Sequence, residues 1–246
     1  MAMQDSCIIQ HFGNLADLTA AEVELLQSLE LNPRTYPAGE IIRSSGARAD
    51  VFFTLNGGWA YAARNLSDGE RQVLDLFLPG QIMGLRELGY DDSLSDFVAL
   101  TEIRACPFPK TRLTEVFDQA PRLADLFMLT LAREQSMLVE RIVNIGRRPA
   151  DRRLAHFVVE MKLRAAPDDP DFELPMNQEV IGDTLGLSSV HVSRTFKSLE
   201  ALGLVLRQGN RIQVGDFQAL VDYAEFNPTY LQRQVAWVRQ AAAEGV

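Results

Sequence analysis

The sequence predicts an α+β fold in three parts: an N-terminal antiparallel β-roll, a long helix and a C-terminal winged helix-turn-helix. Three observations lead to this prediction. Residues 36–109 form short apolar or alternating runs broken by glycine-containing turns, residues 121–146 carry apolar side chains at helical spacing, and residues 177–214 combine two short helical patterns with a hairpin pattern. We place the roll at 1–120, the long helix at 121–146, the winged helix-turn-helix at 147–216 and a helical tail at 217–246.

The composition is that of a soluble globular chain. Its 246 residues are 47% hydrophobic and 23% charged, which suits two domains of ordinary size. No apolar run approaches the ~20 residues that cross a bilayer, and the first residues lack the basic and apolar segments of a secretory signal. Only Cys7 and Cys106 are cysteines, which argues against a disulfide framework and fits a reducing cytoplasm.

The net charge of −9 is unevenly distributed. Residues 1–146 carry 12 basic and 20 acidic side chains, whereas residues 147–215 carry 10 and 9. The acidity therefore belongs mainly to the first half. The later segment remains compatible with a nucleic-acid partner, although its charge alone is no argument for one.

The first part has the texture of a small barrel or roll. Asn56-Gly57 and Asp68-Gly69 supply the positive-φ positions of tight hairpin turns. Short strands of even spacing joined by such turns indicate an antiparallel roll. Before them, Thr19 and Glu22 have the spacing of a capping box, which predicts a short helix.

The predicted long helix needs a partner for its apolar stripe. A helix of ~25 residues is about 37 Å long, more than a small roll can cover. A second copy of the same helix is the simplest partner, and the alternative is packing within its own domain. The stripe that we expect to dimerise comprises Leu123, Phe127, Leu131, Leu138, Ile142 and Ile145.

Gly146 ends this pattern, and Pro149 suits the first turn of the next helix. We predict that Gly146 is a hinge between the long helix and the last part. The alternative is an ordinary glycine at a helix C-terminus.

Residues 177–200 predict two helices joined by a tight turn at Gly186. Ser188 is a good N-cap for the second helix, whose inner face carries Val192, Phe196 and Leu199. The opposite face is small, then polar, then cationic, as entry into a DNA major groove requires. We predict base reading by Ser189, Val190, Ser193 and Arg194, and phosphate contacts by Ser188, His191 and Lys197.

Residues 206–214 predict a hairpin that turns at Gly209-Asn210. This wing is expected to place Arg207 and Arg211 near the DNA backbone. The alternative is that the two helices and the hairpin form only a small α+β core. The complete order of these elements, with an outward arginine, favours DNA binding.

Nearly the whole chain resembles the CRP/FNR superfamily of bacterial transcription regulators. The resemblance rests on short motifs in a fixed order: Pro37-Ala38-Gly39-Glu40, Asp68-Gly69-Glu70-Arg71-Gln72-Val73, Leu78-Pro79-Gly80-Gln81, Arg152-Arg153-Leu154-Ala155, the stretch from Gln178 to Arg194, and the terminal Phe226 to Leu231. It implies a β-roll effector domain, a homodimer along the long helix, a palindromic operator in double-stranded DNA, and RNA polymerase as a further partner. Arg194 then matches the family arginine that reads guanine, Ser193 a serine used by one branch, and His191 a position that contacts phosphate. Val190 stands where well-known members have a glutamate that reads cytosine, and it is suited to a thymine methyl group instead.

The resemblance breaks down at the effector sites. Residues 89–100 contain no basic side chain, and Asp91, Asp92 and Asp96 would repel the phosphate of a cyclic nucleotide. Cys7 alone cannot provide the roughly four thiolates of an iron–sulfur cluster. His11, the only histidine of the first half, is more typical of a structural or solvated side chain than of a haem ligand. We therefore predict no cofactor and no bound metal.

Two function classes remain beside the DNA-binding regulator. One is a sensor of a cyclic-nucleotide-like ligand or of redox state, acting through the roll or Cys106, although the cysteine beside Pro107 is more typical of a core residue. The other is an enzyme, which we do not expect: the sequence has no nucleophile–histidine–acid order, no metal-spaced His/Cys cluster and no phosphate-binding glycine loop.

Overall fold

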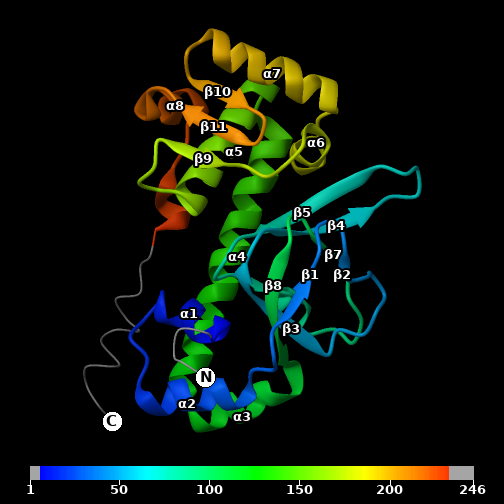
Figure 1. Ribbon diagram of the computed structural model, residues 1–246, viewed down its shortest axis with the longest axis vertical. Helices are drawn as coiled ribbons and strands as arrows, with labels where there is room; N and C mark the ends of the chain where they lie inside the picture. The colour runs from blue at the N-terminus through cyan, green and yellow to red at the C-terminus, as the bar shows by residue number, and fades with distance from the viewer. Residues whose placement is uncertain (1–5, 233–246) are drawn as a thin grey trace. The chain divides into compact units, whose positions relative to one another are not determined.

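The computed structural model describes residues 6–232 and divides into two compact units (Figure 1). In this part of the chain, the first unit contains residues 6–62 and 76–135, and the second contains residues 63–75 and 136–232. The predicted tail at 217–246 is therefore described only as far as residue 232. None of the helices within residues 6–232 is long and apolar enough to cross a membrane.

The N-terminal part is an antiparallel roll of two four-stranded sheets, ordered β1-β8-β3-β6 and β2-β7-β4-β5. Its strands are β1 (Arg34–Tyr36), β2 (Ile41–Arg43), β3 (Val51–Gly57), β4 (Ala60–Asn65), β5 (Arg71–Phe77), β6 (Ile82–Met83), β7 (Asp96–Ala99) and β8 (Ile103–Pro109). The roll confirms the predicted strand region. The tip of the β4–β5 hairpin, residues 63–75, belongs to the second unit.

Short helices flank these strands. They are α1 (Cys7–Gly13), α2 (Ala20–Leu29), the 3-10 turns η1 (Leu85–Glu87) and η2 (Lys110–Arg112), and α3 (Leu113–Gln119). The predicted capping box is confirmed at α2, where Thr19 accepts from the Glu22 amide and Glu22 accepts from the Thr19 amide. One apolar cluster joins α1 to the roll and to the following long helix through Phe12, Phe52 and Phe127.

The two cysteines form a disulfide, which corrects the sequence-based expectation that they do not pair; Cys106 is buried, as expected of a core residue. Cys7 at the start of α1 is bonded to Cys106 in β8, with the Cα atoms 6.3 Å apart. Both side chains are buried, with 1% exposed. The pairing escaped prediction because the residues are 99 positions apart and only the packing of α1 against the roll brings them together.

The long helix α4 (Pro121–Arg147) has 27 residues, one more at its end than predicted. Its apolar stripe divides between two uses. Leu123 and Phe127 are buried in the core of the first unit, so the prediction that they pair with another copy is wrong. The remaining members of the predicted stripe are exposed or half-buried: Leu131, Leu138, Ile142 and Ile145.

The second unit is helical with one small sheet. Its elements after α4 are α5 (Ala150–Ala165), β9 (Asp171–Glu173), α6 (Gln178–Leu185), α7 (Ser189–Ala201), β10 (Val205–Gln208), β11 (Arg211–Val214), α8 (Phe217–Ala224) and η3 (Pro228–Leu231). The sheet order is β10-β11-β9. The predicted hairpin is therefore present. β9 is the third strand of this sheet, and its three residues after Pro170 carry too little alternation to fix its bounds from the sequence.

Candidate nucleic-acid interface

The short turn between α6 and α7 is defined by capping residues at the ends of the two helices. Asn177 caps α6 by accepting from the Val180 amide at 2.8 Å, and Gly186 ends α6 in the left-handed region at φ 64°. Ser188 then caps α7 by accepting from the His191 amide at 3.2 Å. The turn glycine and the serine cap are both as predicted.

A second glycine makes the turn possible and was missed. A Cβ atom on Gly182, inside α6, would collide with the backbone oxygen of Leu187 in the turn. Gly182 therefore lets the chain between the helices pass against α6. Its spacing of four residues before Gly186 was the available signal, because that spacing places both glycines on one side of the helix.

The two faces of α7 differ as the sequence predicts. Val192, Phe196 and Leu199 are buried against the unit's core. On the outer face Ser189, Arg194 and Lys197 are exposed, Ser193 is half-buried, and Val190 has 59% of its surface exposed. The outer face thus offers hydroxyl, methyl and cationic groups to an incoming ligand.

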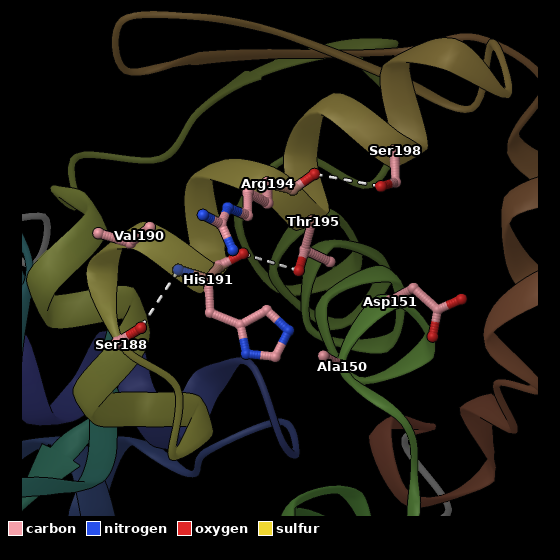
Figure 2. Close-up of a pocket in the computed structure, with 8 residues that line it drawn as sticks. All are labelled: Ala150, Asp151, Ser188, Val190, His191, Arg194, Thr195 and Ser198. Atoms are coloured by element: carbon pink, nitrogen blue, oxygen red, sulfur yellow. Dashed lines mark hydrogen bonds between the residues drawn. The ribbon is translucent and has the colours of Figure 1, made fainter.

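Arg194 lies at the centre of this face (Figure 2). Among residues 6–232 no hydrogen bond or ion pair engages its guanidinium; its backbone carbonyl accepts from Ser198. It borders an open groove of about 550 Å³, which is also lined by Val190 and His191 of α7 and by the first turn of α5. Within the described residues, the guanidinium donors therefore remain available to a partner.

The same groove is lined by an acidic residue, Asp151. Asp151 lies at the first turn of α5, on the far side of the groove from Arg194 (Figure 2). The Tyr223 hydroxyl donates to its carboxylate and lowers the pKa of Asp151. The carboxylate stays ionised, so it limits how far an anionic backbone can enter along α5.

The wing turns as predicted, but one of its two arginines has another role. Arg207 donates to the carbonyls of Gly209 at 3.0 Å and Met176 at 2.8 Å, and its guanidinium lies 4.8 Å from the Phe196 ring centroid. Burial lowers the pKa of Arg207. This corrects the prediction that Arg207 contacts phosphate, because the side chain holds the wing to α7. Arg211 is exposed and lies 4.0 Å from Asp171.

The β4–β5 hairpin adds charged contacts to α6 within the second unit. Arg71 forms an ion pair with Asp183 at 2.6 Å and with Glu179 at 3.3 Å, and the Gln72 amide donates to the Asp183 carbonyl at 2.7 Å. A polar cavity of about 350 Å³ lies here, lined by the hairpin and by Ser188 and Ser189. These contacts could not be predicted from the sequence, since they join residues more than 100 positions apart.

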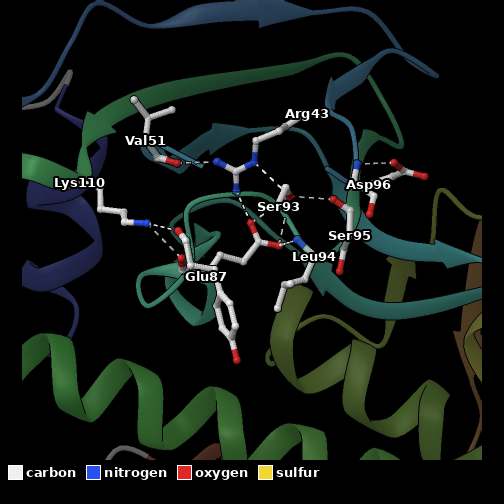
Figure 3. A network of polar contacts seen from close by, with 10 residues as sticks. Arg43, Val51, Glu87, Ser93, Leu94, Ser95, Asp96 and Lys110 are labelled. Carbon is white, nitrogen blue, oxygen red and sulfur yellow. Dashed lines mark hydrogen bonds and ion pairs between the residues drawn. The ribbon is translucent and has the colours of Figure 1, made fainter. Parts of the chain in front are cut away.

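The roll contains a buried cation, Arg43, that the sequence patterns did not indicate. Arg43 of β2 reaches η1 and forms an ion pair with Glu87 at 2.7 Å (Figure 3). Its Nε donates to Ser93 at 3.3 Å, and its Nη1 donates to the Val51 carbonyl at 2.6 Å. Burial lowers the pKa of Arg43, an effect that Glu87 opposes. Arg43 is therefore already neutralised and hydrogen-bonded by its own chain.

Glu87 is as fully occupied as its partner. It accepts from the Leu94 amide at 2.9 Å and from the Ser93 hydroxyl at 3.0 Å (Figure 3). A Cβ on Gly84, where φ is +93°, would lie 2.8 Å from the Arg43 guanidinium. The loop thus closes around an internal ion pair.

Potential metal ligands gather at one place in the described residues. Cys7, Glu30 and Cys106 place their ligand atoms within 4.8 Å of one another. The two sulfur atoms are bonded to each other, so this cluster has no free thiolate as it stands.

Two domain families match separate parts of the sequence. Residues 33–120 match the cyclic nucleotide-binding domain, and residues 152–223 match the Crp-like helix-turn-helix domain. These segments coincide with the roll and with the α5–α8 region.

Characterised proteins are similar to the chain over most of its length. It is 26% identical to the transcriptional activator protein FnrL of Cereibacter sphaeroides, over 89% of this chain and 90% of that protein. It is 29% identical to the nitrogen fixation regulation protein FixK of Bradyrhizobium diazoefficiens, over 81% and 84%. The solved structure of FixK2 from Bradyrhizobium japonicum superimposes with a TM-score of 0.73 at 25% identity, over 78% of this chain and 96% of that one.

Proposed function

Because the chain belongs to the CRP/FNR family of transcription regulators, we propose that it acts as a homodimer that reads a palindromic operator with two copies of α7. The observation that carries this proposal is the exposed face of α7, where no side chain or backbone group of residues 6–232 bonds the guanidinium of Arg194. A helix of this kind fits the major groove, and two-fold symmetry spaces the two reading helices by ~34 Å.

Each exposed residue of α7 receives a role from its chemistry. Arg194 bonds O6 and N7 of a guanine, and Val190 contacts a thymine methyl group. Ser189 and Ser193 complete the base contacts. The phosphate contacts come from Ser188, His191, Lys197 and the exposed wing residue Arg211, which set the register of the protein on the duplex.

The dimer forms along the exposed apolar stripe of α4. The stripe consists of residues at helical spacing whose surfaces are largely uncovered: Met128 at 65%, Val139 at 50%, Ile142 at 62% and Val143 at 43% exposed. The half-buried Leu131, Leu138 and Ile145 border it. Exposed apolar residues along one long helix are best covered by the same residues of a second copy, since the symmetry axis then brings like residues together.

The roll does not suit the two effectors best known in this family. A cyclic nucleotide needs an unpaired cation for its phosphate, whereas Arg43 is paired with Glu87, and Asp91 and Asp92 are exposed on the same loop. An iron–sulfur cluster needs about four thiolates, whereas the chain has two cysteines. We therefore assign the protein no cofactor, and no catalytic role to any residue.

Gly146 is the proposed hinge between α4 and the reading helices. It is exposed in the last turn of α4, and a Cβ added there would meet nothing within 4 Å. Glycine is therefore not required by space at this position. The conformational freedom of glycine would allow α4 to bend when the operator is bound. The proposal places the protein in the cytoplasm, with RNA polymerase as a further partner.

The experiment is selection of bound sequences from a random DNA pool by the purified chain at a stated salt concentration. A two-fold palindrome with a guanine in each half-site is the expected result. Arg194→Ala should lose about 1–3 kcal/mol of binding free energy and remove the base preference at one base pair. The control Lys197→Ala should weaken binding to all sequences alike and reduce the slope of log affinity against log salt by about one. An Arg194→Ala effect equal on every sequence, or an asymmetric selected site, would contradict the proposal.

A further inference from the structure

Helix α1 is fastened to the first unit at both of its ends. At its start, Cys7 is bonded to Cys106, and Glu30 accepts from the Ser6 hydroxyl at 2.8 Å and from the Ile8 amide at 3.0 Å. At its end, His11 donates through Nδ1 to the Gly80 carbonyl at 2.5 Å. One of these interactions, the disulfide, is covalent and can be reduced.

The far end of α1 contacts α4 directly. The Nε2 atom of His11 lies 3.1 Å from the Thr130 hydroxyl of α4, and the Phe12 ring lies edge-on to Phe127 at 4.7 Å between centroids. Thr130 lies two residues after Met128, the first member of the exposed stripe. An interaction that restrains the position of α1 therefore also restrains the part of α4 where the proposed dimer stripe begins.

We propose that Cys7 and Cys106 form a reversible dithiol–disulfide site whose oxidised state locks α1 onto β8 and holds α4 in its DNA-binding form. The effect on DNA rests on the proposed function. The chemistry at the sulfur atoms and its effect on α1 do not depend on it.

The two cysteines have unequal freedom, which sets the order of the exchange. Cys106 lies in β8, which is hydrogen-bonded between β1 and β3, with Thr54 as its register partner in β3. Cys7 lies on the seven-residue α1 and moves when that helix opens. A thiolate formed while α1 is closed would face the Glu30 carboxylate, so exchange begins when α1 has carried Cys7 away.

Oxidation follows from attack on a low-molecular-weight disulfide, RSSR. The Cys7 thiol loses its proton, its sulfur bonds to one sulfur of RSSR, and the other leaves as RSH. The Cys106 sulfur then displaces the second RSH from this mixed disulfide. The two protein thiols lose two electrons and two protons, and RSSR becomes two RSH. An excess of RSH reverses both steps.

The test uses the full chain equilibrated with mixtures of reduced and oxidised glutathione. After acid quenching and denaturation, alkylation should add two groups to the chain in reducing mixtures and none in oxidising ones. Chymotryptic cleavage after Phe12, which is buried in the folded chain, should become about tenfold faster on reduction because α1 opens more often. Operator affinity should fall by about tenfold in parallel.

Cys7→Ser is the matched variant, because it removes the bond without altering β8. It should be cleaved after Phe12 like the reduced chain in every mixture, and its operator affinity should not respond to glutathione. If a serine variant fails to fold, the reduced wild-type chain provides the same comparison.

Three results would overturn the inference. They are two alkylated thiols in the most oxidising mixture, equal cleavage after Phe12 in both states, or one zinc ion retained by each reduced chain on Cys7, Cys106 and Glu30. The proposed function fails separately: a pool selection without a palindrome would remove the homodimeric reading of the operator and leave the cleavage result standing.

Discussion

Acidification should destabilise the protein through His11. The ring is buried between the Gly80 carbonyl and Thr130, and this burial is the main cause that lowers the pKa of His11 from 6.5 to about 4; Arg133 lowers it further, while the Gly80 hydrogen bond raises it. The unfolded chain therefore takes up a proton below pH 6.5, whereas the folded chain does so only near pH 4.

The sign and size of the effect follow from these two values. Between them the unfolded state binds more protons, so stability falls as the pH falls, beginning near pH 6.5 and ending near pH 4. At pH 5 the loss from this one residue is about 2 kcal/mol relative to neutral pH. That is a large fraction of the free energy of unfolding of a folded domain, which is typically about 5–15 kcal/mol.

Urea unfolding at pH 7.5 and pH 5.0 measures this loss. His11→Gln keeps an amide donor for the Gly80 carbonyl but does not titrate, so its free energy of unfolding should drop by about 2 kcal/mol less than that of the wild type over this interval. His191→Gln, which changes an exposed ring, is the control. An identical pH dependence in the wild type and His11→Gln would refute the reasoning.

Further substitutions test the packing within each unit and the dimer. Ile142→Glu should raise the dimer dissociation constant by at least about tenfold, measured by sedimentation velocity, because two carboxylates would meet at the symmetry axis; an unchanged dimer would place the interface elsewhere. Gly182→Ala should lower the free energy of unfolding by about 1–3 kcal/mol, because its Cβ collides with the turn between α6 and α7. Gly146→Ala should raise the free energy of unfolding by at most about 1 kcal/mol and should alter operator affinity. Equal effects of the two alanines on thermal unfolding would contradict this, and an unaltered affinity of Gly146→Ala would remove the hinge. Arg43→Met should cost about 3–5 kcal/mol by leaving Glu87 buried and unpaired, and adding Glu87→Leu should recover most of it in the same unfolding assay; no recovery would mean that the ion pair is not what closes the loop.

Local signals explain why the helix-turn-helix and its hairpin, residues 177–214, were predictable. The Ser188 cap, the Gly186 turn and the turn at Gly209 each depend on side chains and φ values within a few residues. The outward face of α7 follows from helical periodicity alone. The Gly186 turn and the Ser188 cap also lie within the motifs that carry the resemblance to the CRP/FNR family, so both approaches agree at these residues.

Periodicity was insufficient where the partner of a side chain mattered. It identified the apolar stripe of α4, but Leu123 and Phe127 face the core of their own unit while Ile142 remains exposed. Both surfaces are apolar, so the pattern is the same for each. Arg207 was misassigned for a similar reason, because a wing arginine that binds carbonyls has the same sequence signature as one that binds phosphate.

The sequence by itself determined the order of the elements, the helix caps, the turns and the chemistry displayed on α7, because each of these depends on neighbours along the chain. Only the tertiary structure decided that Cys7 meets Cys106, that Arg43 neutralises Glu87 and that Gly182 makes room for the turn. These contacts join residues brought together by packing, and packing depends on shape and volume summed over the whole core, which no single stretch of sequence records.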